Sequence, residues 1–180
     1  MIITEVASEL SPFSKTGGLG DVLAGLPKML ACLGHEVFVF TPYYHHLARE
    51  NVSGRPIHEA KVVVAGQTFI VKLYAYPGKT PRLYRYFVGS DELFSSRERI
   101  YGDADDNLRF LVFCRGVLTF IHWLRIKPDI MHLHDWQTGF IANLVREPVE
   151  PYFNRTAIVY TLHNLLFQLG GECPIKSIEK

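Results

Sequence analysis

Short apolar runs alternate along this chain with longer segments in which apolar residues recur at helical spacing. The runs predict buried strands, because they are nearly continuous in apolar residues and are bounded by glycine, proline or polar residues. These strands are expected at residues 1–8, 35–42, 82–89, 129–135 and 156–164. Residues 22–33 place their apolar side chains on one side of a helix, whereas residues 103–126 predict a helix that is apolar nearly all round and therefore buried.

Proline and glycine refine these boundaries. Pro27 lacks a backbone N–H and predicts a kink in the first helix, and Gly34 predicts the end of that helix. Residues 60–66 and 68–76 are rich in β-branched and aromatic residues and are separated by Gly66-Gln67, which predicts a hairpin. A further short helix is expected over residues 137–147.

The order of these elements predicts an α/β fold with a doubly wound, Rossmann-like parallel sheet and a β-hairpin insertion. Strands that are apolar throughout are typical of a sheet covered on both faces, and parallel neighbours require right-handed crossovers. A length of 180 residues suits a single domain. We therefore expect one Rossmann-like domain over residues 1–180.

The composition limits the classes of partner. With 19 basic and 18 acidic residues the formal net charge is +1, which gives no support for binding to nucleic acid or to an anionic membrane surface. No apolar run approaches the ~20 residues that cross a bilayer. The N-terminus reads as a strand and not as a signal or transit peptide. Cys32, Cys114 and Cys173 are far apart and fit buried thiols in a reducing compartment, so we expect the cytoplasm, or the plastid stroma in a plant.

Polar side chains follow three of the predicted strands at their carboxyl ends. Lys15 to Asp21 come after the first strand, residues 132–137 after the strand that begins at 129, and His163 with Asn164 after the last. Ligands of open α/β sheets bind beyond the carboxyl ends of the parallel strands. This topology therefore predicts that segments far apart in the sequence form one site.

The segment from Lys15 to Asp21 reads KTGGLGD. Gly17 and Gly18 let a ligand approach the backbone closely and allow positive φ, and the following helix start offers unpaired N–H groups and a positive dipole end. With the charge of Lys15, this predicts a site for phosphate or diphosphate. The pattern is neither G-x-G-x-x-G nor a P-loop, and a glycine-rich turn beside a solvated lysine is an equally good interpretation.

His132 and His134 lie two residues apart on a strand and therefore point to the same side. Together with Asp135 they could ligate a metal and serve a metal-dependent hydrolase, but a pair of histidines is a weak signal and hydrogen-bonded core histidines are favoured. Asp135 reads either as a helix N-cap or as a carboxylate that orients a sugar hydroxyl. His163 reads either as a satisfied imidazole or as a group that donates to a sugar hydroxyl or positions a carbonyl near a developing positive charge. Tyr101 reads as part of a capping loop or as a ligand contact.

The segment SELSPFSKTGGLGDV at 8–22 resembles the N-terminal signature of glycogen and starch synthases that use ADP-glucose. The similarity continues through residues 26–44, at Tyr101 with DNLRF at 106–110, at HLHDWQTG in 132–139 and at TLHN in 161–164. The KTGGL and HDWQ elements are specific when they occur together. The resemblance therefore runs along nearly the whole chain.

This resemblance implies one half of a GT-B enzyme, in which two Rossmann-like domains face a cleft. Such enzymes transfer glucose from ADP-glucose to an α-1,4-glucan with retention of configuration, without a metal or another cofactor. It implies that Lys15 and the Gly17-Gly18 backbone face the donor phosphates and glucose, that His163 lies beside the transferred glucose and that Asp135 lies near the sugars. Further substrate contacts are implied at Asp21, Tyr101 and Asn164.

Members of this family are much longer than 180 residues. The resemblance therefore implies an incomplete N-terminal domain, with the C-terminal nucleotide-binding domain outside residues 1–180, and we expect no appreciable glucosyl transfer from these residues alone. Residues 167–180 also depart from the usual family sequence. A non-catalytic glucan- or nucleotide-binding module is the alternative. An incomplete sheet would expose apolar surface, which predicts self-association.

Overall fold

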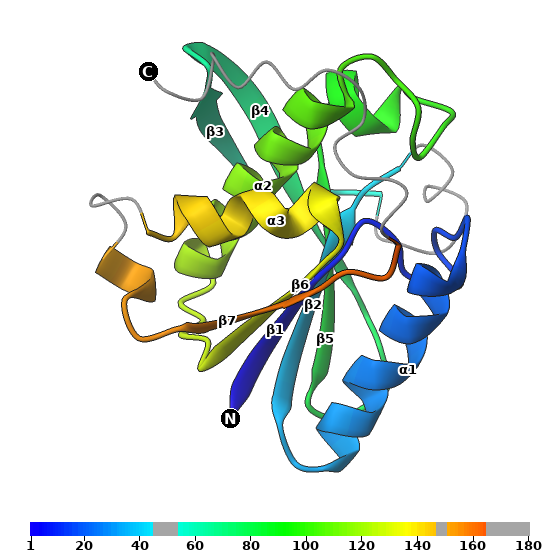
Figure 1. The fold of residues 1–180 in the computed structure, drawn as a ribbon, viewed down its shortest axis with the longest axis vertical. Coiled ribbons are helices and arrows are strands. Elements are labelled where there is room, and N and C mark those ends of the chain that lie inside the picture. The colour runs from blue at the N-terminus through cyan, green and yellow to red at the C-terminus, as the bar shows by residue number, and fades with distance from the viewer. Residues whose placement is uncertain (45–53, 147–150, 165–180) are drawn as a thin grey trace.

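The computed structural model describes residues 1–44, 54–146 and 151–164. They form a seven-stranded sheet in the order β3-β4-β5-β2-β1-β6-β7, with helices on both faces (Figure 1). The strands are β1 (Ile2–Val6), β2 (Glu36–Pro42), β3 (His58–Val64), β4 (Gln67–Tyr76), β5 (Leu83–Gly89), β6 (Ile130–His134) and β7 (Ala157–Thr161). The helices are α1 (Gly18–Cys32), α2 (Asp106–Trp123) and α3 (Trp136–Leu144), with a short π-helix at Asp91–Ser95 and a 3-10 turn at Pro151–Phe153.

The parallel part of the sheet runs from β5 through β2, β1 and β6 to β7. The hairpin of β3 and β4 adds two antiparallel strands next to β5. One face carries α1, and α2 and α3 lie together on the other (Figure 1). The doubly wound α/β prediction and the predicted hairpin insertion are therefore confirmed.

The core lies on both faces of the central strands, where β1 and β2 are almost completely buried. Helix α2 packs against α3 and the hairpin and buries residues around most of its circumference, as its apolar sequence predicts. Gly116 lets α2 approach the sheet closely, since a Cβ there would come within 3.0 Å of Val88 Cγ1. The position of α2 is therefore fixed by backbone contact as well as by large side chains.

One predicted boundary, the end of the first helix, is confirmed, and two others lie at different residues. Gly34 has a φ of +91° and ends α1, with the Gly34 N–H bonded to the Ala31 carbonyl and the His35 N–H to the Leu30 carbonyl. The hairpin turn lies one residue earlier than the predicted Gly66-Gln67 connection: Ala65 and Gly66 both have positive φ, and Gln67 is the first residue of β4. The start of the first helix was misplaced in our prediction, because α1 begins at Gly18 and not at residue 22. It continues through Pro27 as one helix.

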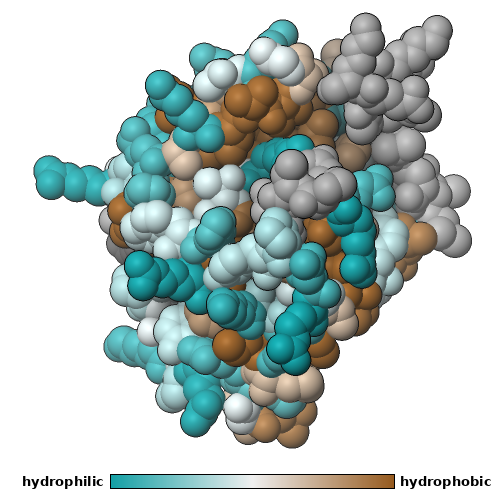
Figure 2. Space-filling model, turned by 90° about the vertical axis from the view of Figure 1, so that its left-hand side faces the viewer, coloured by the Kyte–Doolittle hydropathy of each residue, from teal (hydrophilic) through white to brown (hydrophobic). Residues whose placement is uncertain are grey.

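The surface of the described residues carries scattered apolar side chains. On the side that lies to the left in Figure 1, hydrophilic residues are interspersed with separate groups of hydrophobic ones (Figure 2). Strand β7 lies at an edge of the sheet, and Val159, Tyr160 and Leu162 at that edge are each 43% exposed. None of the helices in the described ranges is long and apolar enough to cross a membrane. Self-association through exposed apolar surface stays a prediction.

Candidate functional site

Three segments that are distant in the sequence begin at the same edge of the sheet, where the parallel strands β1, β6 and β7 end. Strands β1, β6 and β7 are parallel neighbours, so the residues that follow them lie together at the carboxyl edge. The chain after β1 leads into α1, the chain after β6 gives Asp135 and α3, and the chain after β7 gives His163 and Asn164. The predicted convergence of these segments is confirmed.

A buried glutamate that the sequence analysis did not single out holds the glycine loop. Glu9 is only 3% exposed, and its carboxylate accepts hydrogen bonds from the Thr16 N–H and hydroxyl, both at 2.7 Å, and from the Gly17 N–H at 3.2 Å. The Tyr101 hydroxyl donates to the same carboxylate at 2.9 Å, so the Ser8 hydroxyl, 2.7 Å from Tyr101, must donate to the tyrosine oxygen. Burial raises the pKa of Tyr101, which keeps its proton in place. Tyr101 therefore supports the loop through Glu9.

The prediction that Gly17 and Gly18 are needed for positive φ is wrong. Neither Gly17 nor Gly18 has positive φ; Gly17 lies at −147° and Gly18 is the first residue of α1. A Cβ on either would meet nothing within 4 Å, whereas a Cβ on Gly20 would lie 3.2 Å from the Ser14 carbonyl oxygen. Backbone strain and internal packing therefore require glycine at neither Gly17 nor Gly18. What these residues provide is open space directly over the backbone at the helix start.

Lys15 lies beside this helix start in an ion pair. Its ammonium group is 2.8 and 2.7 Å from the two carboxylate oxygens of Asp21, in the first turn of α1. The side chains are 46% and 59% exposed, so water screens the pair and its net stabilisation is less than about 1 kcal/mol. Within the described ranges, no side chain makes a cap hydrogen bond at the start of α1. An anion could therefore recruit the Lys15 ammonium group at little cost and meet the first-turn N–H groups.

His132 and His134 converge on Glu5, a carboxylate on β1 that the sequence analysis also missed. The Glu5 Oε2 atom lies 3.0 Å from His132 Nδ1 and 2.7 Å from His134 Nε2, and the other nitrogen of His132 lies 2.8 Å from the Thr161 hydroxyl. These are hydrogen-bond distances, which supports the reading as hydrogen-bonded core histidines. Among the residues that the structure describes, the group that could share a metal consists of Glu5, His132 and His134. The metal site considered from the sequence combined the two histidines with Asp135, and that choice of carboxylate was wrong, because Glu5 and not Asp135 belongs to this group.

Burial and hydrogen bonding set the charges in this group. Burial by itself raises the pKa of Glu5, but hydrogen bonds from His132 and His134 outweigh it and hold that pKa below its ordinary value. Burial of the His134 ring is the largest influence on its own pKa and lowers it, and the bond to Glu5 offsets this only in part. Near neutral pH the group therefore contains a charged Glu5 and a neutral His134.

Asp135 and His163 are joined directly. The Asp135 Oδ1 atom accepts a hydrogen bond from the His163 backbone N–H at 2.6 Å, and His163 Nε2 lies 2.9 Å from His134 Nδ1. Asp135 stands at the N-cap position of α3, as one of its two interpretations expected, but its carboxylate makes no cap hydrogen bond. Its φ of +59° is unusual for a residue with a side chain. Asp135 thus bridges the ends of β6 and β7, and His163 is exposed beside it.

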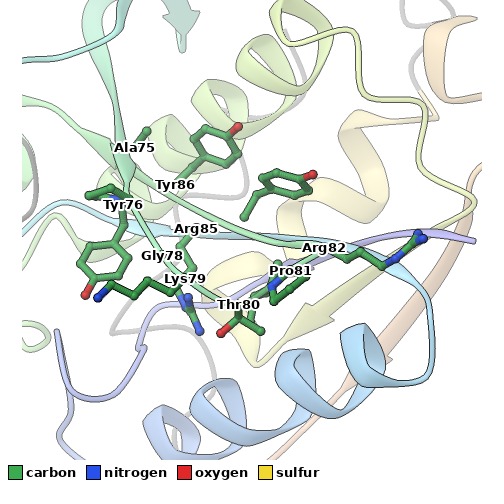
Figure 3. Close-up of a pocket in the computed structure, with 12 residues that line it drawn as sticks. Ala75, Tyr76, Gly78, Lys79, Thr80, Pro81, Arg82, Arg85 and Tyr86 are labelled. Atoms are coloured by element: carbon green, nitrogen blue, oxygen red, sulfur yellow. The ribbon is translucent and has the colours of Figure 1, made fainter.

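A separate hollow of about 390 Å³ lies at the turn between β4 and β5, away from this site. Lys79 and Arg85 lie near Tyr76 on one side of the ribbon, whereas Tyr86 points to the other (Figure 3). Burial lowers the pKa of Arg85, and a Cβ on Gly78 would come within 2.9 Å of its Nη1 atom. Because β5 runs parallel to β2 and begins here, the hollow lies nearer the amino ends of the parallel strands than their carboxyl ends.

Comparison with known proteins gives consistent similarities. The family profile described as the starch synthase catalytic domain matches residues 3–177. Glycogen synthase 2 of Geobacter metallireducens is 40% identical over 176 residues, which are 93% of this chain and 36% of that protein. Glycogen synthase 1 of Synechocystis is 38% identical over 169 residues, which are 93% of this chain and 33% of that protein.

A solved structure shares the fold. The catalytic domain of starch synthase IV from Arabidopsis thaliana, bound to ADP and acarbose, superposes with a TM-score of 0.82 at 33% identity. The match covers 93% of this chain and 34% of the Arabidopsis chain. The present chain thus spans about a third of the length of these relatives.

Proposed function

We propose, since the chain belongs to the starch synthase catalytic domain family, that its carboxyl-edge site forms one wall of a cleft in which glucose passes from ADP-glucose to an α-1,4-glucan with retention of configuration. The Arabidopsis relative is bound to ADP and acarbose, which supports an adenine nucleotide and a glucan-like sugar as ligands. The remaining two-thirds of the relatives' length would supply the rest of the cleft. We therefore expect residues 1–180 alone to bind the donor weakly and to transfer no appreciable glucose.

The donor phosphates would lie over the start of α1. Gly18 leaves the backbone open there, no side chain of the described residues caps the first-turn N–H groups, and Lys15 can turn from Asp21 to a phosphate oxygen. The Gly17 N–H donates to Glu9, so Gly17 contributes open space and the amides from Gly18 onward contribute donors. Stabilisation of the departing diphosphate is the task that suits a cation and a helix start.

The transferred glucose would lie next to His163. Asp135 holds the backbone of His163 through the 2.6 Å hydrogen bond, which places the imidazole and the Asp135 carboxylate at the same point of the edge. A sugar with oxocarbenium character is stabilised by nearby carboxylate and carbonyl oxygens. Asp21 would serve as the resting partner of Lys15, Tyr101 would act through Glu9, and Asn164 would be a further contact beside the glucose.

The single observation that carries this proposal is the open Gly17-Gly18 backbone beside Lys15, at the same sheet edge as His163. Glycines that neither strain nor packing requires are explained by a ligand that lies against them. Without that ligand, alanine would be the more stable choice at Gly18, the first residue of α1.

The test is a titration of the 15N-labelled 180-residue chain with ADP-glucose, followed by amide NMR. We expect the largest shifts at the Gly18 and Leu19 amides. Lys15→Ala should weaken binding about tenfold, whereas Lys28→Ala, which removes an exposed lysine within α1, should not change it. Shifts confined to the hollow around Arg85, or equal effects of the two lysine variants, would refute the site.

A second measurement addresses turnover. Radiolabelled ADP-glucose and glycogen, incubated with the 180-residue chain, should give no incorporation above that of a buffer control. Robust incorporation would show that one wall of the cleft is sufficient, and the requirement for a second wall would then be wrong.

A further inference from the structure

We infer that Glu5, His134 and His163 form a hydrogen-bonded relay in which the buried Glu5 carboxylate fixes the proton of His163 on Nε2, so that Glu5 and His134 are positioning residues for the sugar-facing imidazole. The relay itself depends only on contacts within this chain. Its bearing on catalysis rests on the proposed function, in which His163 meets the transferred glucose.

The relay begins at a group that can only accept hydrogen bonds. Glu5 is fully buried, and the hydrogen bonds from its two histidine partners keep it ionised. A carboxylate has no proton to donate, so the ring nitrogen 2.7 Å away, His134 Nε2, must carry one. In the strand register Glu5 lies opposite His132, which brings this oxygen within reach of β6.

The second step follows from the neutrality of His134. Its ring is fully buried and burial lowers its pKa, so near neutral pH it holds one proton, and Glu5 has placed that proton on Nε2. The opposite nitrogen, Nδ1, is therefore a hydrogen-bond acceptor. It lies 2.9 Å from His163 Nε2, and the two rings are inclined by only 17°.

The third step fixes His163. Because His134 Nδ1 accepts, His163 Nε2 must donate, and it carries a proton whether the His163 ring is neutral or charged. When the ring is neutral, its remaining nitrogen, Nδ1, has only a lone pair. The bond from the His163 backbone N–H to Asp135 holds the main chain, so both ring and backbone are held in place.

The relay restricts how His163 can bind a sugar hydroxyl. A neutral His163 in this relay cannot donate to a sugar hydroxyl from its ring, because its one proton is directed at His134. The sugar hydroxyl must instead donate to His163 Nδ1. This replaces one of the roles offered from the sequence, in which the imidazole donates, and assigns the site a preference for a hydrogen-bond donor on the sugar.

His132 is a control for the relay, because it contacts Glu5 but is not hydrogen-bonded to His163. It contacts the same Glu5 oxygen at 3.0 Å, but its other ring nitrogen bonds to the Thr161 hydroxyl at 2.8 Å and does not touch His163. The titratable groups that bear on the relay within the described residues are thus Glu5, His132, His134, His163 and Asp135. A change at His132 should disturb the cluster without changing the proton position on His163.

The experiment reads the histidine tautomers directly. Long-range 1H–15N NMR of the 180-residue chain, with labelled histidine and at a pH where His163 is neutral, should show a protonated Nε2 and an unprotonated Nδ1 on His163. Glu5→Met removes the acceptor at similar volume, so His163 should then show a mixture of the Nε2 and Nδ1 tautomers. Glu5→Gln keeps an acceptor oxygen, so His163 should stay protonated on Nε2. His132→Gln should leave the His163 tautomer unchanged. ADP-glucose affinity should fall about threefold to tenfold in Glu5→Met, as expected for one misdirected hydrogen bond.

A wild-type His163 protonated on Nδ1, or an even mixture of tautomers, would overturn the relay even if Glu5→Met did not fold. Equal effects of His132→Gln and Glu5→Met on the tautomer would also overturn it, since the cause would then be general disruption of the cluster. If the expected tautomer is found but ADP-glucose perturbs neither His163 nor the helix start, the relay stands and the proposed function fails.

Discussion

Gly18→Ala separates the stability of the helix start from its function. Gly18 is the first residue of α1, lacks positive φ, and leaves room for a Cβ that would meet nothing within 4 Å. Alanine is a better helix former than glycine and also restricts the unfolded chain. The substitution should therefore stabilise the fold while it fills the space that we assign to a donor phosphate.

The two effects have different sizes. An alanine in place of a helical glycine gains about 0.5–1 kcal/mol in a helix interior, and we expect the lower value at the first position. For a chain of this length that corresponds to a melting temperature about 1–2 °C higher. Displacing a phosphate from one charge-assisted hydrogen bond costs about 1.5–3 kcal/mol, which is roughly a tenfold to hundredfold loss of affinity.

The assay pairs thermal unfolding by circular dichroism with calorimetric titration of ADP-glucose. Gly25→Ala is the matched control, because Gly25 lies in the same helix, is exposed and would likewise place an added Cβ with nothing within 4 Å. Gly25→Ala should stabilise the chain by about 0.5–1 kcal/mol and leave affinity unchanged. If Gly18→Ala binds ADP-glucose as tightly as the wild type, the glycine is not needed for a ligand and the phosphate site is wrong.

Three other perturbations test separate contacts. Lys15→Ala should change the free energy of unfolding by less than about 1 kcal/mol in urea denaturation, because its ion pair is exposed; a larger loss would indicate a structural role. Tyr101→Phe removes the hydroxyl that donates to Glu9 and should lower the free energy of unfolding by about 1.5–3 kcal/mol by the same method. A loss under about 0.5 kcal/mol would contradict the support of the glycine loop by Tyr101 through Glu9. In the folded chain the pKa of His134 lies below its ordinary value of 6.5 and the pKa of Glu5 lies below its ordinary value of 4.5, so on acidification the unfolded chain binds each proton before the folded chain does. The free energy of unfolding should therefore fall as the pH drops below 6.5, because of His134, and fall again below pH 4.5, because of Glu5. Urea midpoints measured across this range that stay constant would refute those shifts.

Part of the site followed from the strand pattern alone. Parallel strands put their carboxyl ends at one edge, so Lys15, Asp135 and His163 could be assigned to one place without any knowledge of contacts. The same-side placement of His132 and His134 followed from the two-residue period of a strand and is confirmed by their shared bond to Glu5.

Other details depended on partners that no local pattern identifies. Glu5 and Glu9 drew no attention in the sequence, because an acidic residue in or just after a strand carries no signal of burial. Glu5 meets His134 across 129 positions of the chain, and Tyr101 meets Glu9 across 92. Asp135 precedes a helix, which made a helix cap one of its two interpretations, but its carboxylate bonds to a backbone group 28 residues later.

The sequence by itself determined the α/β class, the hairpin, the buried long helix and the edge of the sheet at which the site forms. These follow from the spacing of apolar residues, which acts over a few positions, and from the rule that parallel strands share their carboxyl edge. Only the tertiary structure decided that Glu9 holds the glycine loop, that the glycines are open and unstrained, and that Glu5 directs the protons of His134 and His163. These features depend on hydrogen bonds and open space that form only when the strands and their connecting loops have been assembled, and partners such as Glu5 and His134 are far apart in the sequence.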